Sequence, residues 1–305
     1  MILVTGAAGF IGSHTVDRLL ADGHRVLGID NFDGNYARAI KENNLTAARA
    51  HPRFMFRELD LLEPGALAQA ITSAAPEPVH AIVHLAARTG VRDSIADTLH
   101  LLEAARVHRI GHVVFGSSSS VYGINPRVPW RENDRDLEPI SPYASTKLSA
   151  EMLGHVYSAV HGVRFIALRF FTVYGPRQRP DLAIARFVEK LRAGQPLPRF
   201  GDGSSRRDYT FVDDIVDGVV RAVAYQESAF EIINLGNNNP VSLAEIIAAV
   251  GSVFGVTPAV EALPEQRGDV PRTWADVSKA QRLLGWRPRT ELDAGLRAYR
   301  AWLER

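Results

Sequence analysis

The chain has 305 residues, of which 46% are hydrophobic and 23% charged, and this is the composition of an ordinary globular protein. Its 35 basic and 34 acidic side chains leave a formal charge of +1, so no electrostatic argument favours nucleic acid or an anionic membrane as a partner. The absence of cysteine excludes disulfides, thiolate nucleophiles and cysteine-ligated metal sites. The chain opens on MILVTGAAGF without the pattern of a signal peptide, and we expect a cytoplasmic protein.

The first half of the chain alternates short β-type apolar runs with helical patterns. Such alternation predicts parallel strands joined by crossover helices. The expected strands are Met1 to Thr5, Arg25 to Asp30, Arg53 to Glu58, Ala81 to Leu85, His112 to Ser117 and Arg164 to Arg169. These runs predict an α/β fold with a doubly wound parallel sheet of the Rossmann type.

After Arg169 the composition changes, because Gly, Pro, Arg and Asp gather in long irregular stretches such as GPRQRP and GQPLPRFGDGSSRRD. Compact domains usually keep such stretches for binding loops. Between them, Val212 to Tyr225 predicts a helix and Glu231 to Leu235 a strand, so the chain is expected to return to the sheet. The sequence therefore predicts a Rossmann domain from residues 1–168 and 208–236, and a smaller α/β substrate-binding domain from residues 169–207 and 237–305.

A glycine-rich loop, TGAAGFIGSH, lies between the first expected strand and a helical pattern, with Gly6, Gly9 and Gly12 three positions apart. Small residues there let the backbone approach a pyrophosphate at a helix N-terminus. The second strand ends in Asp30, where a carboxylate can bind the adenosine ribose and repel a 2′-phosphate, which favours NAD over NADP. The alternative is that the glycines only make a tight turn and Asp30 caps a loop.

Further cofactor contacts are expected from the loop itself and from the ends of neighbouring strands, although these residues also suit ordinary strand ends. They are Phe10, Ile11, Asn31, Asp60, Leu61, Leu85, Ala86 and Ala87.

The segment SPYASTKLSAEML predicts a helix that carries the chemistry. Ser141 is a plausible N-cap, and Tyr143 and Lys147 lie one turn apart on one face. A neighbouring ammonium and a helix N-terminus both favour a phenolate, so Tyr143 is expected to accept a proton at working pH. The polar run from Ser117 to Ser120 follows the fifth strand, at the edge where such folds bind ligands. The alternative is that Tyr143 and Lys147 only form part of a solvated helix face, because the spacing YxxxK by itself is common on such faces.

Taken together, TGAAGFIG, HLAA, SSSSVYG, YASTK, RFFTVYGPRQRP and SSRRDYTFVDD resemble the extended short-chain dehydrogenase/reductase family, in particular its NAD-dependent nucleotide-sugar epimerases. The resemblance implies Ser118, Tyr143 and Lys147 as the catalytic set, with Tyr143 and Lys147 also touching NAD. In such enzymes the tyrosine removes the sugar O4 proton while NAD takes hydride from C4, and the transient 4-keto sugar takes the hydride back on its other face. The family also implies a homodimer and a UDP-sugar substrate.

Related dehydratases and decarboxylases carry an acid directly before VYG, where this chain has Ser119 and Ser120. Thr172, in RFFTVYG, together with Arg179 resembles the UDP-glucuronic acid 4-epimerases, whereas UDP-glucose 4-epimerases typically have asparagine in place of the threonine. UDP-glucose 4-epimerase therefore stays open as the alternative, and UDP-glucuronate decarboxylase as a weaker one.

A uronate needs charge neutralisation and several donors, which Arg179, Thr172, Ser119 and Ser120 are able to supply. Oxidation at C4 makes a β-keto acid, and we hypothesise that these groups hold its carboxylate out of the alignment that expels carbon dioxide. By the same resemblance, further substrate contacts are expected at Arg92, Arg207 for the diphosphate and Asp269 for the uridine ribose. No metal is expected, because the histidine pairs lack completing ligands.

The segment after Arg92 departs from the family, since it is shorter by about a dozen residues than a full crossover unit needs. We expect a short helix from Thr98 to Arg109 there. Either the segment is truly shortened or the printed sequence omits residues at this point, and the loss of a family contact and of half a dimerisation helix favours the second.

Overall fold

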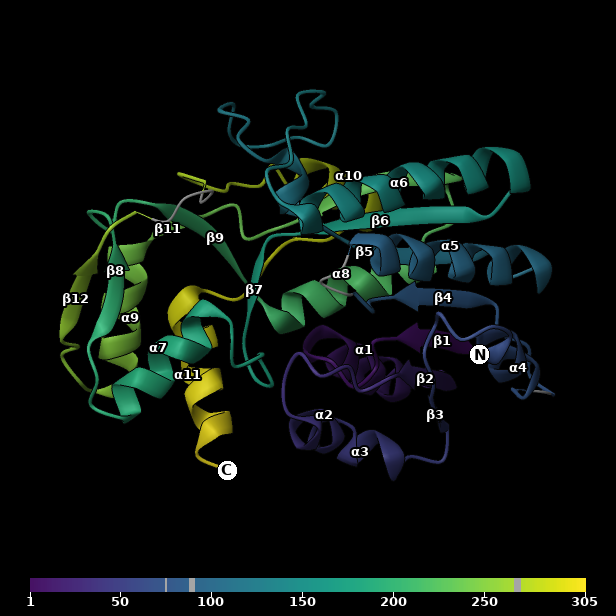
Figure 1. Ribbon diagram of the computed structural model, residues 1–305, viewed down its shortest axis with the longest axis horizontal. Helices are drawn as coiled ribbons and strands as arrows, with labels where there is room; N and C mark the ends of the chain where they lie inside the picture. The colour runs from purple at the N-terminus through teal and green to yellow at the C-terminus, as the bar shows by residue number, and fades with distance from the viewer. Residues whose placement is uncertain (75, 88–90, 266–269) are drawn as a thin grey trace.

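The computed structural model describes residues 1–74, 76–87, 91–265 and 270–305 (Figure 1). A parallel sheet of seven strands forms its centre, in the order β10-β6-β5-β4-β1-β2-β3. The strands are β1 (Ile2–Thr5), β2 (Val26–Asp30), β3 (Phe54–Glu58), β4 (Ala81–His84), β5 (His112–Ser118), β6 (Arg164–Phe170) and β10 (Phe230–Leu235). The predicted Rossmann-type sheet is confirmed, and the expected strand positions agree with the observed ones to within one or two residues.

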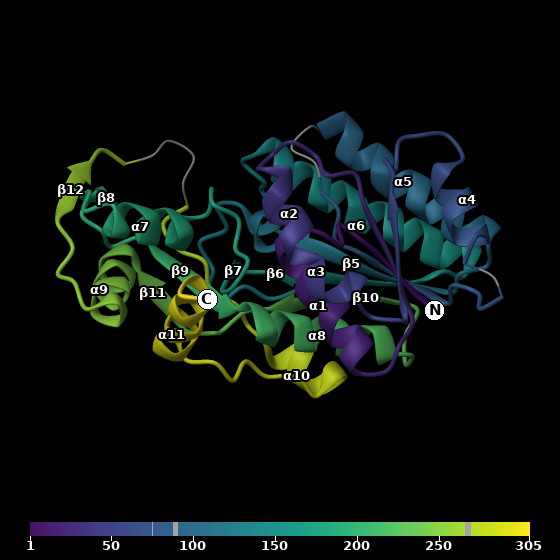
Figure 2. The same cartoon turned by 90° about the horizontal axis from the view of Figure 1, so that it is seen from below.

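Helices cover both faces of this sheet (Figures 1 and 2). One face packs against α4 (Ala66–Thr72), α5 (Val91–Val107) and α6 (Pro142–His161). The other packs against α1 (Phe10–Ala21), α3 (Thr46–Arg49), α8 (Val212–Ala224) and α10 (Ser278–Leu284), while α2 (Arg38–Asn44) precedes α3. In β1, Leu3 packs on the first face, and Ile2 and Val4 pack on the second. Because both faces are buried there, an inner strand such as β1 is a continuous apolar run rather than an alternating one.

A smaller unit lies beside the carboxyl edge of the sheet, on the left in Figure 1. It holds a three-stranded sheet and a two-stranded sheet. Their strands are β7 (Thr172–Tyr174), β9 (Arg206–Phe211) and β11 (Pro240–Ser242), and β8 (Leu197–Phe200) with β12 (Val260–Leu263). Three helices pack on them: α7 (Ala183–Arg192), α9 (Leu243–Phe254) and α11 (Leu292–Leu303). The domain boundaries given above stay a prediction, and α10, which they place in the smaller domain, packs on α8 and β10.

The expected short helix from Thr98 to Arg109 is wrong at both ends. Helix α5 already begins at Val91 and ends at Val107, and Arg109 has a positive φ of 56°. Its 17 residues span about 25 Å at a rise of ~1.5 Å per residue. The helix therefore recrosses the sheet because residues 91–97, which precede the expected helix, are helical as well.

Candidate active site

A cavity of about 450 Å³ opens where the carboxyl ends of β1, β2, β4, β5 and β6 meet the smaller unit. It brings together most of the residues that the sequence singled out. These are Gly6, Gly9, Phe10, Ile11, Gly12, Asp30, Asn31, Leu61, Leu85, Ala86, Ala87, Ser118, Ser119, Tyr143, Lys147, Thr172 and Arg179.

The glycine loop turns from β1 into α1 with no room for a Cβ at Gly6 or Gly12. Gly6 has a φ of +69°, and a Cβ there would lie 2.7 Å from the Ala86 nitrogen. A Cβ on Gly12 would lie 1.9 Å from the Gly6 carbonyl oxygen. The α1 N-cap, Gly9, provides no side-chain hydrogen bond to the first turn. The first N–H groups of α1 thus remain available for an anion such as a diphosphate.

We expect Gly12→Ala to weaken NAD binding about tenfold or more, because overpacking of at least ~1–3 kcal/mol distorts the loop that receives the diphosphate. Calorimetric titration of NAD, together with the amount of NAD bound per purified chain, measures this effect. Gly111→Ala is the matched control, since a Cβ at Gly111 meets nothing within 4 Å. An unchanged dissociation constant for Gly12→Ala would contradict the assignment of the loop.

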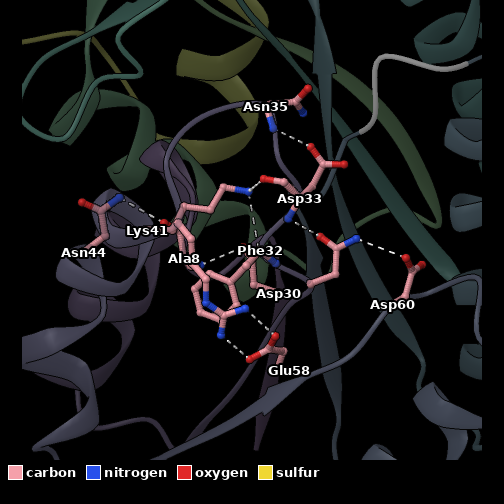
Figure 3. Close-up of polar contacts among 11 residues, drawn as sticks. Ala8, Asp30, Phe32, Asp33, Asn35, Lys41, Asn44, Glu58 and Asp60 are labelled. Atoms are coloured by element: carbon pink, nitrogen blue, oxygen red, sulfur yellow. Dashed lines mark hydrogen bonds and ion pairs between the residues drawn. The ribbon is translucent and has the colours of Figure 1, made fainter.

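Asp30 ends β2 in a rigid polar corner of the cavity (Figure 3). Its carboxylate accepts hydrogen bonds from the backbone N–H groups of Ala8 at 3.0 Å and Phe32 at 2.8 Å. Lys41 Nζ lies 3.9 Å from Asp30 Oδ1 and donates to the Asp33 carbonyl at 2.8 Å. Burial raises the pKa of Asp30, and Lys41 and the two N–H groups act against that rise. The corner therefore holds a fixed acceptor suited to a ribose diol.

Asn31 and Asp60 form the next contact of this corner. Asn31 Nδ2 donates to Asp60 Oδ2 at 3.2 Å (Figure 3). Asn31 is part of the cavity wall, whereas Asp60 is not. The expected contact of Asp60 with a cofactor stays a prediction. The glycine loop, the helix N-terminus and the Asp30 corner together fit a dinucleotide such as NAD.

The catalytic candidates come from two adjoining elements. Ser118 ends β5 and caps a 3₁₀ turn, Ser119–Tyr122, by accepting hydrogen bonds from the Ser120 N–H at 3.2 Å and the Ser120 hydroxyl at 2.9 Å. Ser141 Oγ accepts from the Ala144 N–H at 3.1 Å and so starts α6, as the sequence predicted. Ser120 is thereby directed to Ser118 rather than into the cavity wall.

Tyr143 and Lys147 lie on the same face of α6, with Lys147 Nζ 5.7 Å from the centre of the Tyr143 ring. Lys147 is buried, and its ammonium donates to the Gly116 carbonyl at 2.8 Å. Burial lowers the pKa of Lys147 to about 8, although Glu151 acts in the opposite direction. The arrangement places a cation beneath the phenol ring at the floor of the cavity.

The expectation that Lys147 and the helix N-terminus favour a phenolate at Tyr143 stays a prediction. Burial raises the pKa of Tyr143, and this outweighs the hydrogen bond from Ser118 and the charge of Arg179, which both lower it. The physical reason is desolvation of the charged form, with the ammonium directed to Gly116 instead of the hydroxyl.

The substrate candidates separate into two groups. Thr172, Ser119 and Arg179 line the cavity, and Arg179 is paired with Asp181. Arg207 lies on β9 outside the cavity wall and donates to the Arg206 carbonyl at 2.8 Å, and Arg92 is exposed in the first turn of α5. Neither is among the residues of the cavity wall, and the expected substrate contacts of both stay predictions. Asp269 lies outside the described residues.

Several residues of the cavity wall were missed. Tyr36 and Lys41 come from the stretch after β2, and Asp97 comes from α5. The irregular segment FDGNY directly follows the carboxyl end of a central strand, which is the position where this fold binds ligands, and this signal was available in the sequence. Among the described residues, no group of three His, Asp or Glu side chains is arranged to hold a metal ion.

Residues 2–236 match the model of the NAD dependent epimerase/dehydratase family. The chain belongs to this family. It is 37% identical over 313 residues to the UDP-glucuronate 4-epimerase of Thermodesulfobacterium geofontis, which covers 98% of this chain and 95% of the relative. It is 34% identical over 331 residues to the probable UDP-glucuronate 4-epimerase of Rhizobium meliloti, with coverage of 99% and 96%.

Solved structures of the family agree with these relatives. The UDP-glucuronic acid 4-epimerase of Bacillus cereus in complex with UDP-glucuronic acid and NAD superposes with a TM-score of 0.88, at 36% identity, over 99% of this chain and 98% of that one. The UDP-glucose 4-epimerase of Thermotoga maritima with UDP-glucose also gives a TM-score of 0.88, at 31% identity, over 99% and 98%. In the part of our chain that the structure describes, no helix is both long and apolar enough to span a membrane.

Proposed function

We propose that this family member interconverts UDP-glucuronic acid and UDP-galacturonic acid by epimerisation at C4, with NAD as its bound cofactor. The observation that carries the proposal is a single cavity whose wall joins the dinucleotide-binding loop to Ser118, Tyr143 and Lys147, and these to Thr172 and Arg179. The UDP-glucuronate 4-epimerases among the relatives, which cover nearly the whole chain, support the choice of sugar.

In the proposed reaction, Tyr143 accepts the proton of the sugar O4 hydroxyl, and Ser118 hydrogen-bonds the same oxygen. Lys147 keeps a positive charge near the phenolate and binds the nicotinamide ribose of NAD. NAD, when bound, supplies the chemistry that this chain lacks: it takes the hydride from C4 and later returns it. Tyr143 then gives its proton back to O4 after the 4-keto sugar has turned its other face, so no external reductant is consumed.

The carboxylate of the sugar needs its own binding groups. Arg179 offers a guanidinium and Thr172 and Ser119 offer hydroxyls on the sugar side of the cavity. While C4 is a carbonyl, the sugar is a β-keto acid that loses carbon dioxide when its carboxyl bond aligns with the carbonyl π system. We propose that these three side chains hold the carboxylate out of that alignment.

The decisive assay incubates the purified protein separately with UDP-glucuronic acid and UDP-glucose and follows the products by proton NMR. We expect UDP-galacturonic acid from the first and much slower formation of UDP-galactose from the second. Faster turnover of UDP-glucose would establish the alternative function instead. A UDP-pentose as the main product of UDP-glucuronic acid would establish a decarboxylase.

We also propose a homodimer formed through α5 and α6. Met152, Val156 and Val160 lie four residues apart on α6 and are 64%, 50% and 67% exposed, and Val107 at the end of α5 is 61% exposed. An apolar stripe of this kind on two adjacent helices suits burial against a second copy. The cytoplasmic location expected from the sequence stays a prediction.

The double variant Met152→Glu/Val156→Glu is expected to be a folded monomer, because it places four charges at the centre of the proposed interface when both copies are counted. Sedimentation velocity of the NAD-loaded protein reports the mass in solution. Val256→Glu changes an exposed valine elsewhere, 49% exposed, and should leave the dimer intact. A double variant with the same mass as the parent would contradict the proposed interface.

A further inference from the structure

The guanidinium of Arg179 is held from one side by a carboxylate two residues along the same loop. Arg179 Nε donates to Asp181 Oδ1 at 3.0 Å, and Arg179 Nη2 donates to Asp181 Oδ2 at 2.6 Å. Arg179 lines the cavity, whereas Asp181 does not. Asp181 thus binds the guanidinium without itself being part of the cavity wall.

The geometry of this pair leaves a specific part of the guanidinium for a ligand. A guanidinium carries five N–H groups in a planar fork, and Asp181 takes those along the Nε edge. The remaining three belong to Nη1 and Nη2 at the end of the fork, which is an edge that accepts a carboxylate with two parallel hydrogen bonds. Arg179 is therefore able to bind Asp181 and a substrate carboxylate at the same time.

The pair of Arg179 and Asp181 is expected to contribute little to the stability of the fold. The two side chains are 43% and 54% exposed, and ion pairs that water reaches contribute little to folding because solvent screens them. A free arginine side chain, however, has many rotamers to lose when it binds a ligand. A partner that fixes it beforehand removes that loss from the binding step.

We propose that Asp181 is a positioning residue for uronate recognition: it fixes the Arg179 guanidinium so that the outer edge of the fork meets the sugar carboxylate. This inference rests on the proposed function and names the residue that prepares its carboxylate site. It assigns Asp181 no contact with the nucleotide or with the reacting C4 carbon.

The test measures binding and turnover of the NAD-loaded protein and its Asp181→Asn variant. We expect the KM for UDP-glucuronic acid, and its calorimetric dissociation constant, to rise about tenfold while kcat changes less than about threefold. The dissociation constant of UDP alone should stay unchanged. The proportion of UDP-pentose by-product should rise, because the carboxylate is held less firmly. Asp181→Glu, which keeps the carboxylate, should recover part of the affinity.

Two controls separate this role from a general effect of charge. Asp202→Asn removes the same charge from another exposed loop, where Asp202 accepts a hydrogen bond from the Ser204 N–H, and should change nothing. In an Arg179→Lys background, Asp181→Asn should add little further loss, because Asp181 acts through the arginine fork.

The possible outcomes distinguish a failure of the Asp181 inference from a failure of the proposed function on which it rests. If the parent epimerises UDP-glucuronic acid and Asp181→Asn leaves its KM unchanged, or lowers it because Asp181 competes with the substrate, the inference fails and the function stands. Additive losses in the Arg179→Lys background would also overturn it. If the parent binds and converts UDP-glucose in preference to UDP-glucuronic acid, the proposed function fails and the inference fails with it.

Discussion

Tyr143→Phe is expected to lower kcat for C4 epimerisation by about 10²–10⁴-fold, which is the usual contribution of a positioned general acid–base group. Phenylalanine keeps the ring over Lys147 but removes the oxygen that takes the O4 proton. NAD content and UDP binding should stay close to those of the parent, because the hydroxyl is not part of the glycine loop or the Asp30 corner. Steady-state kinetics and calorimetry on the same preparation measure both quantities.

Tyr157→Phe provides the matched control for this variant. Tyr157 lies on the same helix, and its hydroxyl donates to Glu103 at the surface, away from the cavity. It should keep the parent rate. A Tyr143→Phe protein that turns over UDP-glucuronic acid as fast as the parent would remove Tyr143 from the mechanism and with it the central step of the proposal.

The local part of this site could be predicted from the sequence because its signals are short-range. The glycine spacing, the strand that ends in Asp30 and the pair Tyr143 and Lys147 each depend on neighbouring residues along one element, and the fold then brings these elements to one sheet edge. In a doubly wound sheet that convergence follows from parallel strand direction alone.

The parts that the sequence leaves open depend on how loops and helix ends lie in three dimensions. Arg207 and Arg92 have the right residue type, but they are not among the residues of the cavity wall, and their role stays a prediction. The pKa of Tyr143 depends on how far the fold removes its phenol from water, which no spacing reveals. The pairing of Glu151 with Arg169 joins α6 to β6 and is equally invisible in the sequence.

That pairing leads to the second large effect: Glu151→Gln is expected to lower the free energy of unfolding by about 3–5 kcal/mol. Glu151 Oε1 accepts from Arg169 Nε at 2.9 Å and from the Ser117 hydroxyl at 2.5 Å, and Oε2 accepts from Arg169 Nη2 at 2.7 Å. Both members of the pair are about 1% exposed, so glutamine leaves the arginine charge buried and uncompensated. Denaturant unfolding of parent and variant measures the difference.

An exposed arginine–glutamate pair with two hydrogen bonds serves as the control. Arg38 donates to both oxygens of Glu58 at 2.7 Å, and the two side chains are 51% and 47% exposed. Glu58→Gln should leave unfolding nearly unchanged, since water screens the arginine that remains. Equal effects of the two substitutions would show that burial does not decide the energy of these pairs.

Glu151→Gln should also shift the alkaline limb of the pH–activity profile to lower pH, for a reason unrelated to folding. Lys147 interacts with Tyr143 and Glu151 on α6 and with His84 on β4, and burial keeps His84 neutral by lowering its pKa to about 3. Burial lowers the pKa of Lys147 to about 8 and the charge of Glu151 raises it, so its loss lowers that pKa further. Lys147 then loses its charge, and the proposed support for the phenolate, at lower pH.

Over the pH range in which activity falls, the Lys147 contribution to the free energy of unfolding is expected to rise. This difference separates the effect on activity from an effect on folding. The pKa of Lys147 in the folded parent, about 8, lies below its ordinary value of 10.5. Between these values the unfolded chain binds a proton that the folded chain has released, so the Lys147 contribution to stability rises with pH. Loss of kcat/KM above pH 8, while unfolding becomes no easier, would assign the limb to Lys147 itself. An alkaline limb at the same pH in Glu151→Gln would show that Glu151 does not set the charge of the lysine and acts only on packing.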